Sequence, residues 1–318
     1  MLRILVVGAG AVGGYFGLLW CAVGRDITFL VREGRRDAIA RSGLTLVREG
    51  GELRTQPPAI VASDIRSRYD VIFLAVPGHA LADVIAELRP AIGPKSVIIS
   101  SLNGVSHFDA LRAAFGDEIV LGSVVKCVAT LDDIGRIVEL ARLAEIAIGL
   151  WNGGNGEQLE AIRSCLAIEG MTVRISATIR EEIAEKWLMM AALGAANSLL
   201  GGTVGDINAQ PYGAWAIQKL LDEAHRALVE LSMPPRPGAL EALAGMLGDP
   251  TSRQTASIYR NMLAGRAVEH EPIIGDIIAR VSDHTAYPLL SAAYARLSIY
   301  EAKRRQSVAT RSPSKVAG

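Results

Sequence analysis

Residues 4–14 read ILVVGAGAVGG, and this stretch decides the fold of the first half of the chain. Its first four residues, Ile4 to Val7, are apolar and predict a short buried strand. The glycines that follow have the pattern G-x-G-x-x-G, and a helical pattern begins within it. The first glycine permits a tight turn, the second lets a pyrophosphate approach the backbone, and the third lets the helix pack close to the strand. The turn therefore predicts a dinucleotide site at the N-terminus of the helix. The residues expected to contact the dinucleotide are Gly8, Gly10, Ala11, Val12 and Gly13.

Strand and helix patterns alternate beyond this turn. Apolar, β-branched runs predict strands at residues 2–7, 27–31, 71–76, 96–100, 120–127 and 144–149. Helical patterns cover residues 11–23, 35–42, 80–88 and 108–115. Continuously apolar strands that alternate with helices are typical of a parallel sheet covered on both faces. The last two strands have no helix between them, so we expect an antiparallel extension there, closed by a helix at 157–168 and a strand at 172–175.

Strand patterns disappear from about Thr178 onward. Long helical patterns follow at residues 179–200, 211–231, 238–247, 252–264, 272–283 and 289–303. The sequence thus predicts an α/β fold in which a Rossmann-like dinucleotide-binding domain, residues 1–177, precedes an all-α domain, residues 178–303. Residues 304–318 are polar and rich in small side chains, which predicts a disordered tail.

Composition narrows the class of protein. The 318 residues include 33 basic and 33 acidic side chains, so no net charge favours nucleic acid or an anionic membrane. No uninterrupted apolar run reaches the ~20 residues that a membrane span needs, and we expect a cytoplasmic protein that binds neither. Cys21, Cys127 and Cys165 lie far apart in apolar surroundings, which predicts buried free thiols and no metal site.

The end of the second predicted strand bears on the choice of cofactor. Sites that prefer NAD place an acidic residue there, whereas an arginine suits the 2′-phosphate of NADP because its planar fork of donors matches a phosphate. Here the strand is followed by Arg32, then Glu33, with Arg35 and Arg36 close behind. We therefore expect NADP(H), held by Arg32. Two alternatives stay open: Glu33 could turn inward, or the segment could be a solvated charged loop.

Asn103 follows the fourth predicted strand, at the sheet edge where cofactors bind in such folds. Its amide could bond a nicotinamide ribose or a substrate oxygen. An Asn-Gly pair is also a common turn signal, so Asn103 and Gly104 could simply mark a turn.

Five segments together resemble the ketopantoate reductase family, which reduces 2-dehydropantoate to pantoate in pantothenate biosynthesis. They are residues 4–17, 29–32, 102–105, 183–188 and 255–275, and the resemblance extends to about residue 300. It implies an NADPH-dependent 2-oxo acid reductase whose catalytic lysine is Lys186. It also implies that Ser257 holds the substrate carboxylate and that Glu269 positions substrate and lysine.

Elementary chemistry supports these roles. A ketone that accepts a hydride becomes an alkoxide, which needs a proton donor and a positive partner. Lys186 can serve as both, and its apolar neighbours would ease the loss of its proton. The plainer alternatives are a lysine at a helix edge with its head in solvent, and a solvated Glu269 beside the equally acidic Glu271.

Three positions depart from the family pattern. Pro77 stands where many members carry a lysine near the cofactor, and Met190 and Gly194 stand where members often carry asparagines that contact substrate. We expect an apolar contact at Met190 and an open space at Gly194 in their place. Asn197 lies on the same helix face as Lys186, but about 16 Å further along, so we expect a buried amide between helices. These changes weaken the assignment of the substrate more than that of the chemistry.

The most economical interpretation is NADPH-dependent reduction of 2-dehydropantoate in a cleft between the two domains, with Asn103, Lys186, Ser257 and Glu269 contacting substrate. One alternative is a reductase of a different small 2-oxo acid, which an apolar Met190 would suit. Another is an NADP-binding sensor without catalysis, although a sensor needs neither Lys186 nor Glu269. The helical domain could supply a homodimer interface, but nothing in the sequence requires one.

Overall fold

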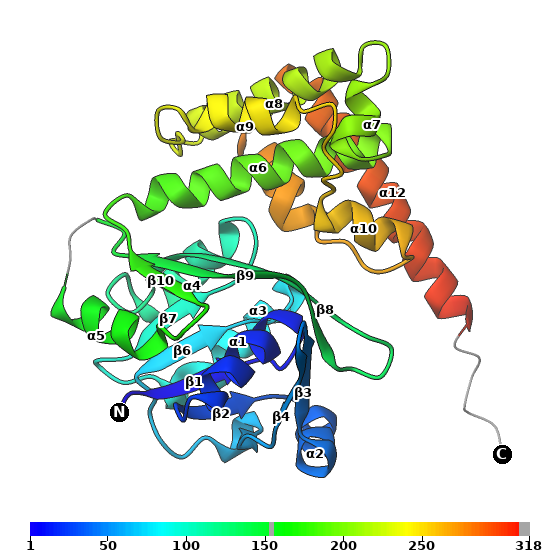
Figure 1. The fold of residues 1–318 in the computed structure, drawn as a ribbon. Coiled ribbons are helices and arrows are strands. Elements are labelled where there is room, and N and C mark those ends of the chain that lie inside the picture. Colours follow the sequence, from blue (N-terminus) through cyan, green and yellow to red (C-terminus); the bar gives the residue numbers. More distant parts are fainter. Residues whose placement is uncertain (153–155, 312–318) are drawn as a thin grey trace. The chain divides into compact units, whose positions relative to one another are not determined.

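A computed structural model describes residues 1–152 and 156–311 of the chain (Figure 1). The chain divides into two compact units: the first comprises Met1–Leu102 and Ser106–Ile183, and the second comprises Asn103–Val105 and Ala184–Gly318. The division differs from the expected boundary at residues 177 and 178 in two ways. It falls six residues later, and it assigns a short segment of the first half to the second unit.

The later boundary has a packing cause. Helix α6 (Ile179–Leu200) begins in the first unit, where Ile179 covers two glycines of neighbouring strands. A Cβ atom added at Gly122 or Gly149 would lie 2.8 Å from atoms of Ile179, so the isoleucine fills that space. Glu182, one turn later, is buried and accepts hydrogen bonds from Arg174 and Ser176. The first turn of α6 is therefore part of the core of the first unit.

A five-stranded parallel sheet forms the centre of the first unit, as expected. Its order is β5-β2-β1-β6-β7, and all four pairings are parallel. The strands are β1 (Arg3–Val7), β2 (Asp26–Leu30), β5 (Ala59–Ile60), β6 (Val71–Leu74) and β7 (Val97–Ser100). The helices associated with them are α1 (Ala11–Ala22), α2 (Glu33–Ser42), α3 (Leu81–Leu88) and α4 (Ser106–Phe115). Ile4 to Val7 are at most 2% exposed, because helices and a second sheet cover both faces of such strands.

The expected antiparallel extension is instead a separate second sheet. Its order is β10-β9-β3-β4, with β8 pairing antiparallel to β9. The strands are β3 (Leu44–Arg48), β4 (Gly51–Thr55), β8 (Gly122–Leu131), β9 (Ile137–Gly149) and β10 (Thr172–Ile175), with α5 (Glu157–Leu166) before the last. Helix α1 packs against strands of both sheets, and its Phe16 and Trp20 belong to the core of the first unit. A helix with two covered faces must be apolar nearly all round, as α1 is.

The second unit is helical, as expected. Its remaining helices are α7 (Val204–Asn208), α8 (Gly213–Glu230), α9 (Ala239–Leu247), α10 (Ser257–Leu263), a π-helical turn (Glu271–Gly275), α11 (Asp276–Arg280) and α12 (Pro288–Arg311). Short 3₁₀ turns occur in both units, among them Ala62–Asp64 in the first and His284–Ala286 in the second.

The prediction of a disordered tail from residue 304 is wrong for residues 304–311, which continue α12. Glu301 accepts hydrogen bonds from Arg304 and Arg305, three and four residues later on the same helix, and such pairs support a helix end. Residues 312–318 lie outside the described part of the chain.

The three cysteines are free thiols, but each is only half-buried rather than buried. Burial raises the pKa of Cys21 to about 11, so this thiol is inert at neutral pH. Within residues 1–152 and 156–311, no helix is both long and apolar enough to cross a membrane. In the same residues, no group of three or more His, Cys, Asp or Glu side chains is placed to hold a metal ion.

We expect Gly13→Ala to lower the free energy of unfolding by roughly 1–3 kcal/mol, the usual cost of overpacking. A Cβ atom at residue 13 would lie 2.1 Å from the carbonyl oxygen of Gly8, and this backbone atom cannot move away as a flexible side chain could. Gly10→Ala is the matched control, because its Cβ atom would meet nothing within 4 Å. Urea unfolding of both variants makes the comparison, and equal destabilisation would contradict the packing argument.

Candidate functional site

The glycine turn has the geometry that the sequence predicts. Gly8 has φ +98°, and a Cβ atom there would lie 2.5 Å from the carbonyl oxygen of Ala75, so only glycine fits. Gly10 is the N-cap of α1 and has no side chain to cap it. Ala11 and Val12 follow in the first turn, whose N–H groups have no partner within the helix. The space in front of Gly10 is open, which suits a phosphate at the helix N-terminus.

A pocket of about 1260 Å³ lies over this turn, within the first unit. Small-molecule pockets usually measure about 300–1,000 Å³, so this one has room for an extended molecule such as a dinucleotide. Gly8, Ala9 and Gly10 line one part of it, and the ends of β2 and β6 line others. Pro77 also lines it and is exposed, so it offers this pocket neither a charge nor an N–H donor.

Charged residues gather where β2 leads into α2. Arg32 is the N-cap of α2, Glu33 is its first residue, and both are exposed and line the pocket. Arg35, half-buried, lines the same pocket and donates a hydrogen bond from Nη2 to the carbonyl oxygen of Ala9, at 3.1 Å. Open space at Gly10, the N-terminus of α1 and two cations fit a dinucleotide cofactor.

In the second unit, Asn103 and Glu269 meet directly. The Asn103 amide donates from Nδ2 to the Glu269 carboxylate at 3.0 Å. The next residue, Gly104, has φ +77°, and a Cβ atom there would lie 2.1 Å from the carbonyl oxygen of Pro272. The Asn-Gly pair is thus both a turn and a contact, because the turn seats Asn103 beside the segment that carries Glu269.

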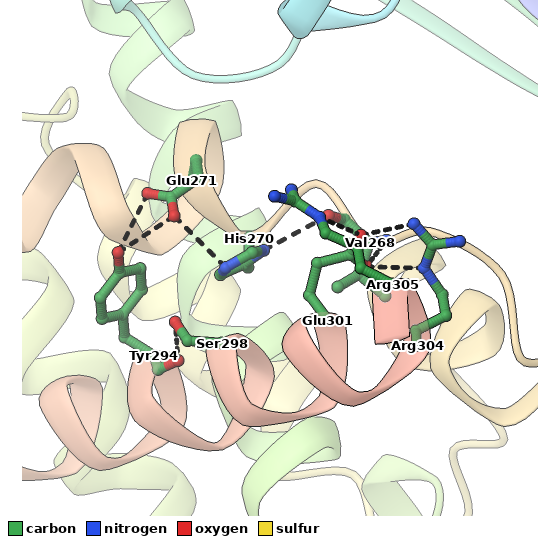
Figure 2. Close-up of polar contacts among 8 residues, drawn as sticks. All are labelled: Val268, His270, Glu271, Tyr294, Ser298, Glu301, Arg304 and Arg305. Carbon is green, nitrogen blue, oxygen red and sulfur yellow. Dashed lines mark hydrogen bonds and ion pairs between the residues drawn. The ribbon is translucent and has the colours of Figure 1, made fainter. Parts of the chain in front are cut away.

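Helix α12 also anchors that segment (Figure 2). The backbone N–H of Val268 donates to the buried carboxylate of Glu301 at 3.4 Å. His270 is 4% exposed, and its ring nitrogens lie 3.3 Å from the carbonyl oxygen of Val268 and 3.3 Å from the Glu271 carboxylate. Glu271 also accepts from the Tyr294 hydroxyl at 3.1 Å. Glu269 lies between Val268 and His270 and is exposed. Its backbone is therefore held on both sides while its carboxylate stays accessible.

Lys186 lies on α6 and is half-buried. Its neighbour Trp187 is 1% exposed and donates from Nε1 to the carbonyl oxygen of Ile273, at 2.9 Å. Ile273 belongs to the π-helical turn that follows Glu269 closely in sequence. The lysine and the glutamate thus sit on backbone segments that are joined by a buried hydrogen bond.

Asn197 forms the buried amide that we expected. It is fully buried, accepts a hydrogen bond from the N–H of Ala256 at 2.8 Å and donates to the carbonyl oxygen of Gly202 at 3.0 Å. Ala256 is the N-cap of α10, and Ser257 is its first residue and is exposed. Asn197 therefore fixes the start of α10, where Ser257 is placed. The sequence indicated a structural amide at this position but not that it holds the segment bearing Ser257.

The position of Gly194 differs from the expectation of an open space. A Cβ atom added there would lie 3.2 Å from a methyl group of Ile258 and 4.0 Å from one of Ile273. Both isoleucines are buried, so α10 and the π-helical turn fill the room that a larger side chain would need. Met190, one turn before Gly194, is half-buried, and between Met190 and Gly194 this face of α6 is apolar.

Both halves of the chain match models of one protein family. Residues 4–153 match the family model described as ketopantoate reductase PanE/ApbA, and residues 178–301 match the model of its C-terminal domain. YkpB, an uncharacterized oxidoreductase of Bacillus subtilis (strain 168), is 32% identical over 304 residues, which cover 95% of this chain and all of that protein. A 2-dehydropantoate 2-reductase of Mesorhizobium japonicum is 23% identical, covering 87% of this chain and 90% of that protein.

Solved structures share the fold over nearly the whole chain. A D-mandelate dehydrogenase in complex with NADH and anilino(oxo)acetate has a TM-score of 0.82 at 18% identity, covering 96% of this chain and 100% of that one. A 2-dehydropantoate 2-reductase from Geobacter metallireducens GS-15 has a TM-score of 0.80 at 20% identity, covering 94% and 99%.

We expect Glu301→Gln to lower the free energy of unfolding by roughly 1–3 kcal/mol at neutral pH, because it weakens charge-assisted hydrogen bonds at a buried carboxylate. Hydrogen bonds from Arg304 and Arg305 hold the pKa of Glu301 at about 2, below its ordinary 4.5. A carboxylate whose pKa falls on folding stabilises the protein above its ordinary pKa, and this stabilisation is lost as pH falls toward the folded value.

The difference between wild type and Glu301→Gln should therefore be constant above about pH 5 and shrink between about pH 4.5 and 2. Urea unfolding at a series of pH values measures it. Glu160→Gln is the matched control, since Glu160 forms an exposed pair with Arg163 three residues later and such pairs contribute little. A difference that grows on acidification would contradict this account.

Proposed function

Because this chain belongs to the ketopantoate reductase family, we propose that it catalyses NADPH-dependent reduction of a small 2-oxo acid, with 2-dehydropantoate as the leading substrate. Pantoate would be the product, which places the reaction in pantothenate and coenzyme A biosynthesis. The observation that carries the proposal is a group of hydrogen-bonded residues in the second unit. Asn103 donates to Glu269. The segments that carry Lys186 and Ser257 are held by hydrogen bonds of the buried side chains of Trp187 and Asn197. Its supporting context is the glycine turn with its pocket.

NADPH, when bound in the pocket over the glycine turn, supplies the hydride. The protein itself must bind the 2-oxo acid and protonate its carbonyl oxygen. Lys186 carries out the protonation, because its ammonium group bonds the carbonyl oxygen and gives up a proton as the carbonyl becomes an alcohol. The same positive charge stabilises negative charge as it develops on that oxygen. A proton from solvent then restores the ammonium group.

Ser257 binds the carboxylate of the 2-oxo acid, and its backbone supports this role. It is the first residue of α10 and is exposed, so its hydroxyl is accessible to a ligand. Asn197 holds the backbone immediately before it.

Glu269 and Asn103 act as a pair. The hydrogen bond from Asn103 occupies one oxygen of the Glu269 carboxylate, which leaves the other available to accept from Lys186 or from the substrate. The tether to α12 keeps this carboxylate in place without enclosing it.

NADP(H) rather than NAD(H) is the proposed cofactor. Arg32 and Arg35 both line the pocket at the end of β2, where the ribose that carries the 2′-phosphate binds in folds of this class. Glu33 lines it too, and it is the group that would accept the ribose hydroxyls of NADH.

We expect Lys186→Ala to lower kcat for 2-dehydropantoate roughly 10²- to 10⁴-fold, the usual contribution of a general acid. NADPH affinity, measured by fluorescence titration, should stay within about twofold of the wild-type value, since a lost proton donor affects the chemical step. Lys219→Ala is the control, because Lys219 is an exposed lysine of α8 paired with Asp222. Near-normal turnover by Lys186→Ala would refute the proton-donor role.

A second candidate substrate is a 2-oxo acid with a plain hydrocarbon tail. The α6 face beyond Lys186 presents Met190 and then Gly194 covered by Ile258, and neither Met190 nor Ile258 can bond a hydroxyl group. A protein of the same fold, the D-mandelate dehydrogenase, was solved with anilino(oxo)acetate, an oxo acid with an apolar ring.

Two substrates that differ by one hydroxyl distinguish the candidates: 2-dehydropantoate and trimethylpyruvate, which lacks only that hydroxyl. If the apolar candidate is right, kcat/KM for trimethylpyruvate equals or exceeds that for 2-dehydropantoate. Met190→Asn should then shift the ratio toward 2-dehydropantoate by roughly 5- to 20-fold, the value of one hydrogen bond. A wild type that strongly prefers 2-dehydropantoate, with no shift in the variant, would exclude a role for Met190 in specificity.

A further inference from the structure

We propose that Arg35 forms the 2′-phosphate site of NADPH together with Arg32, and that Arg35 is the stronger determinant of the preference for NADPH over NADH. This inference rests on the proposed function, because it takes the pocket over the glycine turn to be the nucleotide site.

The guanidinium of Arg35 is a half-buried cation that bonds a neutral group. It donates from Nη2 to the carbonyl oxygen of Ala9, at 3.1 Å. Three carboxylates line the same pocket, those of Glu33, Asp83 and Glu87. Yet across residues 1–152 and 156–311 no carboxylate forms an ion pair with Arg35, and burial alone lowers the pKa of its guanidinium. A partly desolvated charge of this kind costs free energy unless an anion compensates it.

The adjacent residue shows the contrast. Arg36 forms ion pairs with Asp37 at 2.9 Å and with Asp64 at 3.9 Å, so its charge is used to fasten α2 to the 3₁₀ turn that contains Asp64. Arg35, one position earlier on the same helix, is held at the pocket wall instead. The bond to Ala9 fixes one edge of the guanidinium group and leaves its remaining N–H groups for a ligand.

The position of Arg35 favours the 2′-phosphate over the pyrophosphate. The pyrophosphate belongs at the N-terminus of α1, where the space in front of Gly10 is open. Arg35 lies on α2, one turn after Arg32 at the end of β2, and this is where the adenosine ribose binds in such folds. A planar guanidinium can hold a phosphate through two parallel hydrogen bonds.

Arg32 and Arg35 should contribute unequally. Arg32 is exposed, so solvent and salt screen its charge and its side chain must be ordered when the phosphate binds. Arg35 is already ordered by Ala9 and partly shielded from water. A pre-ordered, partly desolvated cation binds a phosphate more strongly than a mobile, hydrated one.

The test measures dissociation constants on the full-length protein, by calorimetry with 2′,5′-ADP and 5′-AMP and by fluorescence with NADPH and NADH. We expect Arg35→Met to weaken 2′,5′-ADP and NADPH roughly 10- to 100-fold, with 5′-AMP and NADH changed less than about threefold. Arg32→Met should have a smaller effect in the same direction. Arg36→Met, whose charge is paired elsewhere, is the control and should leave the ratio of NADPH to NADH affinity unchanged. The melting temperature of each variant without ligand verifies folding.

Each alternative outcome has a distinct meaning. Equal weakening of NADPH and NADH by Arg35→Met would assign Arg35 to the pyrophosphate and overturn the proposal, as would no effect on either. Arg35→Lys, which keeps the charge without the planar fork, should recover part of the preference. A wild type that binds NADH and NADPH alike would refute the cofactor of the proposed function itself. A wild type that prefers NADPH, with the preference intact in Arg35→Met, would refute only the role of Arg35.

Discussion

The first unit depends on the close approach of α1 to β1. The Cα atom of Gly13 lies against the carbonyl oxygen of Gly8, with no room for a side chain between them. This contact sets the distance between helix and sheet, and it aims the unpaired N–H groups of α1 into the pocket. The rigid floor of the pocket follows from this constraint.

The second unit meets a different requirement, because its candidate residues come from segments far apart in the sequence. Three hydrogen bonds hold these segments together. They join Asn103 to Glu269, Trp187 to Ile273 and Asn197 to Ala256. The last two are buried, and in each a side chain bonds a backbone atom. Bonds of this kind fix a backbone path while leaving the functional side chains free to contact substrate. The arrangement thus separates the residues that position the backbone from the candidate residues that we propose to react.

Much of the fold could be predicted because local patterns and tertiary packing agree. The parallel strands are continuous apolar runs, and α6 begins and ends where the sequence indicates. Strands β3 and β4 were not predicted because their outer residues are charged, as in Arg48 and Glu52, and periodicity is weak over five residues. The end of α12 was not predicted because the polar composition of the tail hides the spacing by which Glu301 bonds forward to Arg304 and Arg305.

Some features of the candidate site could be predicted from the sequence and others could not. The tight turn at Gly8 and the open space at Gly10 could be predicted from the sequence, because both follow from a local pattern. Arg35 could not be separated from Arg36, because only the fold shows that one is paired with Asp37 and Asp64 and the other is turned to the pocket. Nor could the sequence show that isoleucines close the space over Gly194, since they come from a distant helix and a π-helical turn.

The second unit contains a short segment from the first half of the chain, which limits where a gene for this protein could be cut into two fragments. A fragment ending at residue 177, where the strand pattern stops, would lack Ile179 and Glu182 and would leave part of the first core bare. A fragment containing only residues 184–318 would lack Asn103 and Gly104, which belong to the second unit although they are encoded in the first half. No single cut therefore yields two complete halves. Recombination between relatives should accordingly preserve function best when the short segment at residues 103–105 and the helical half come from the same parent.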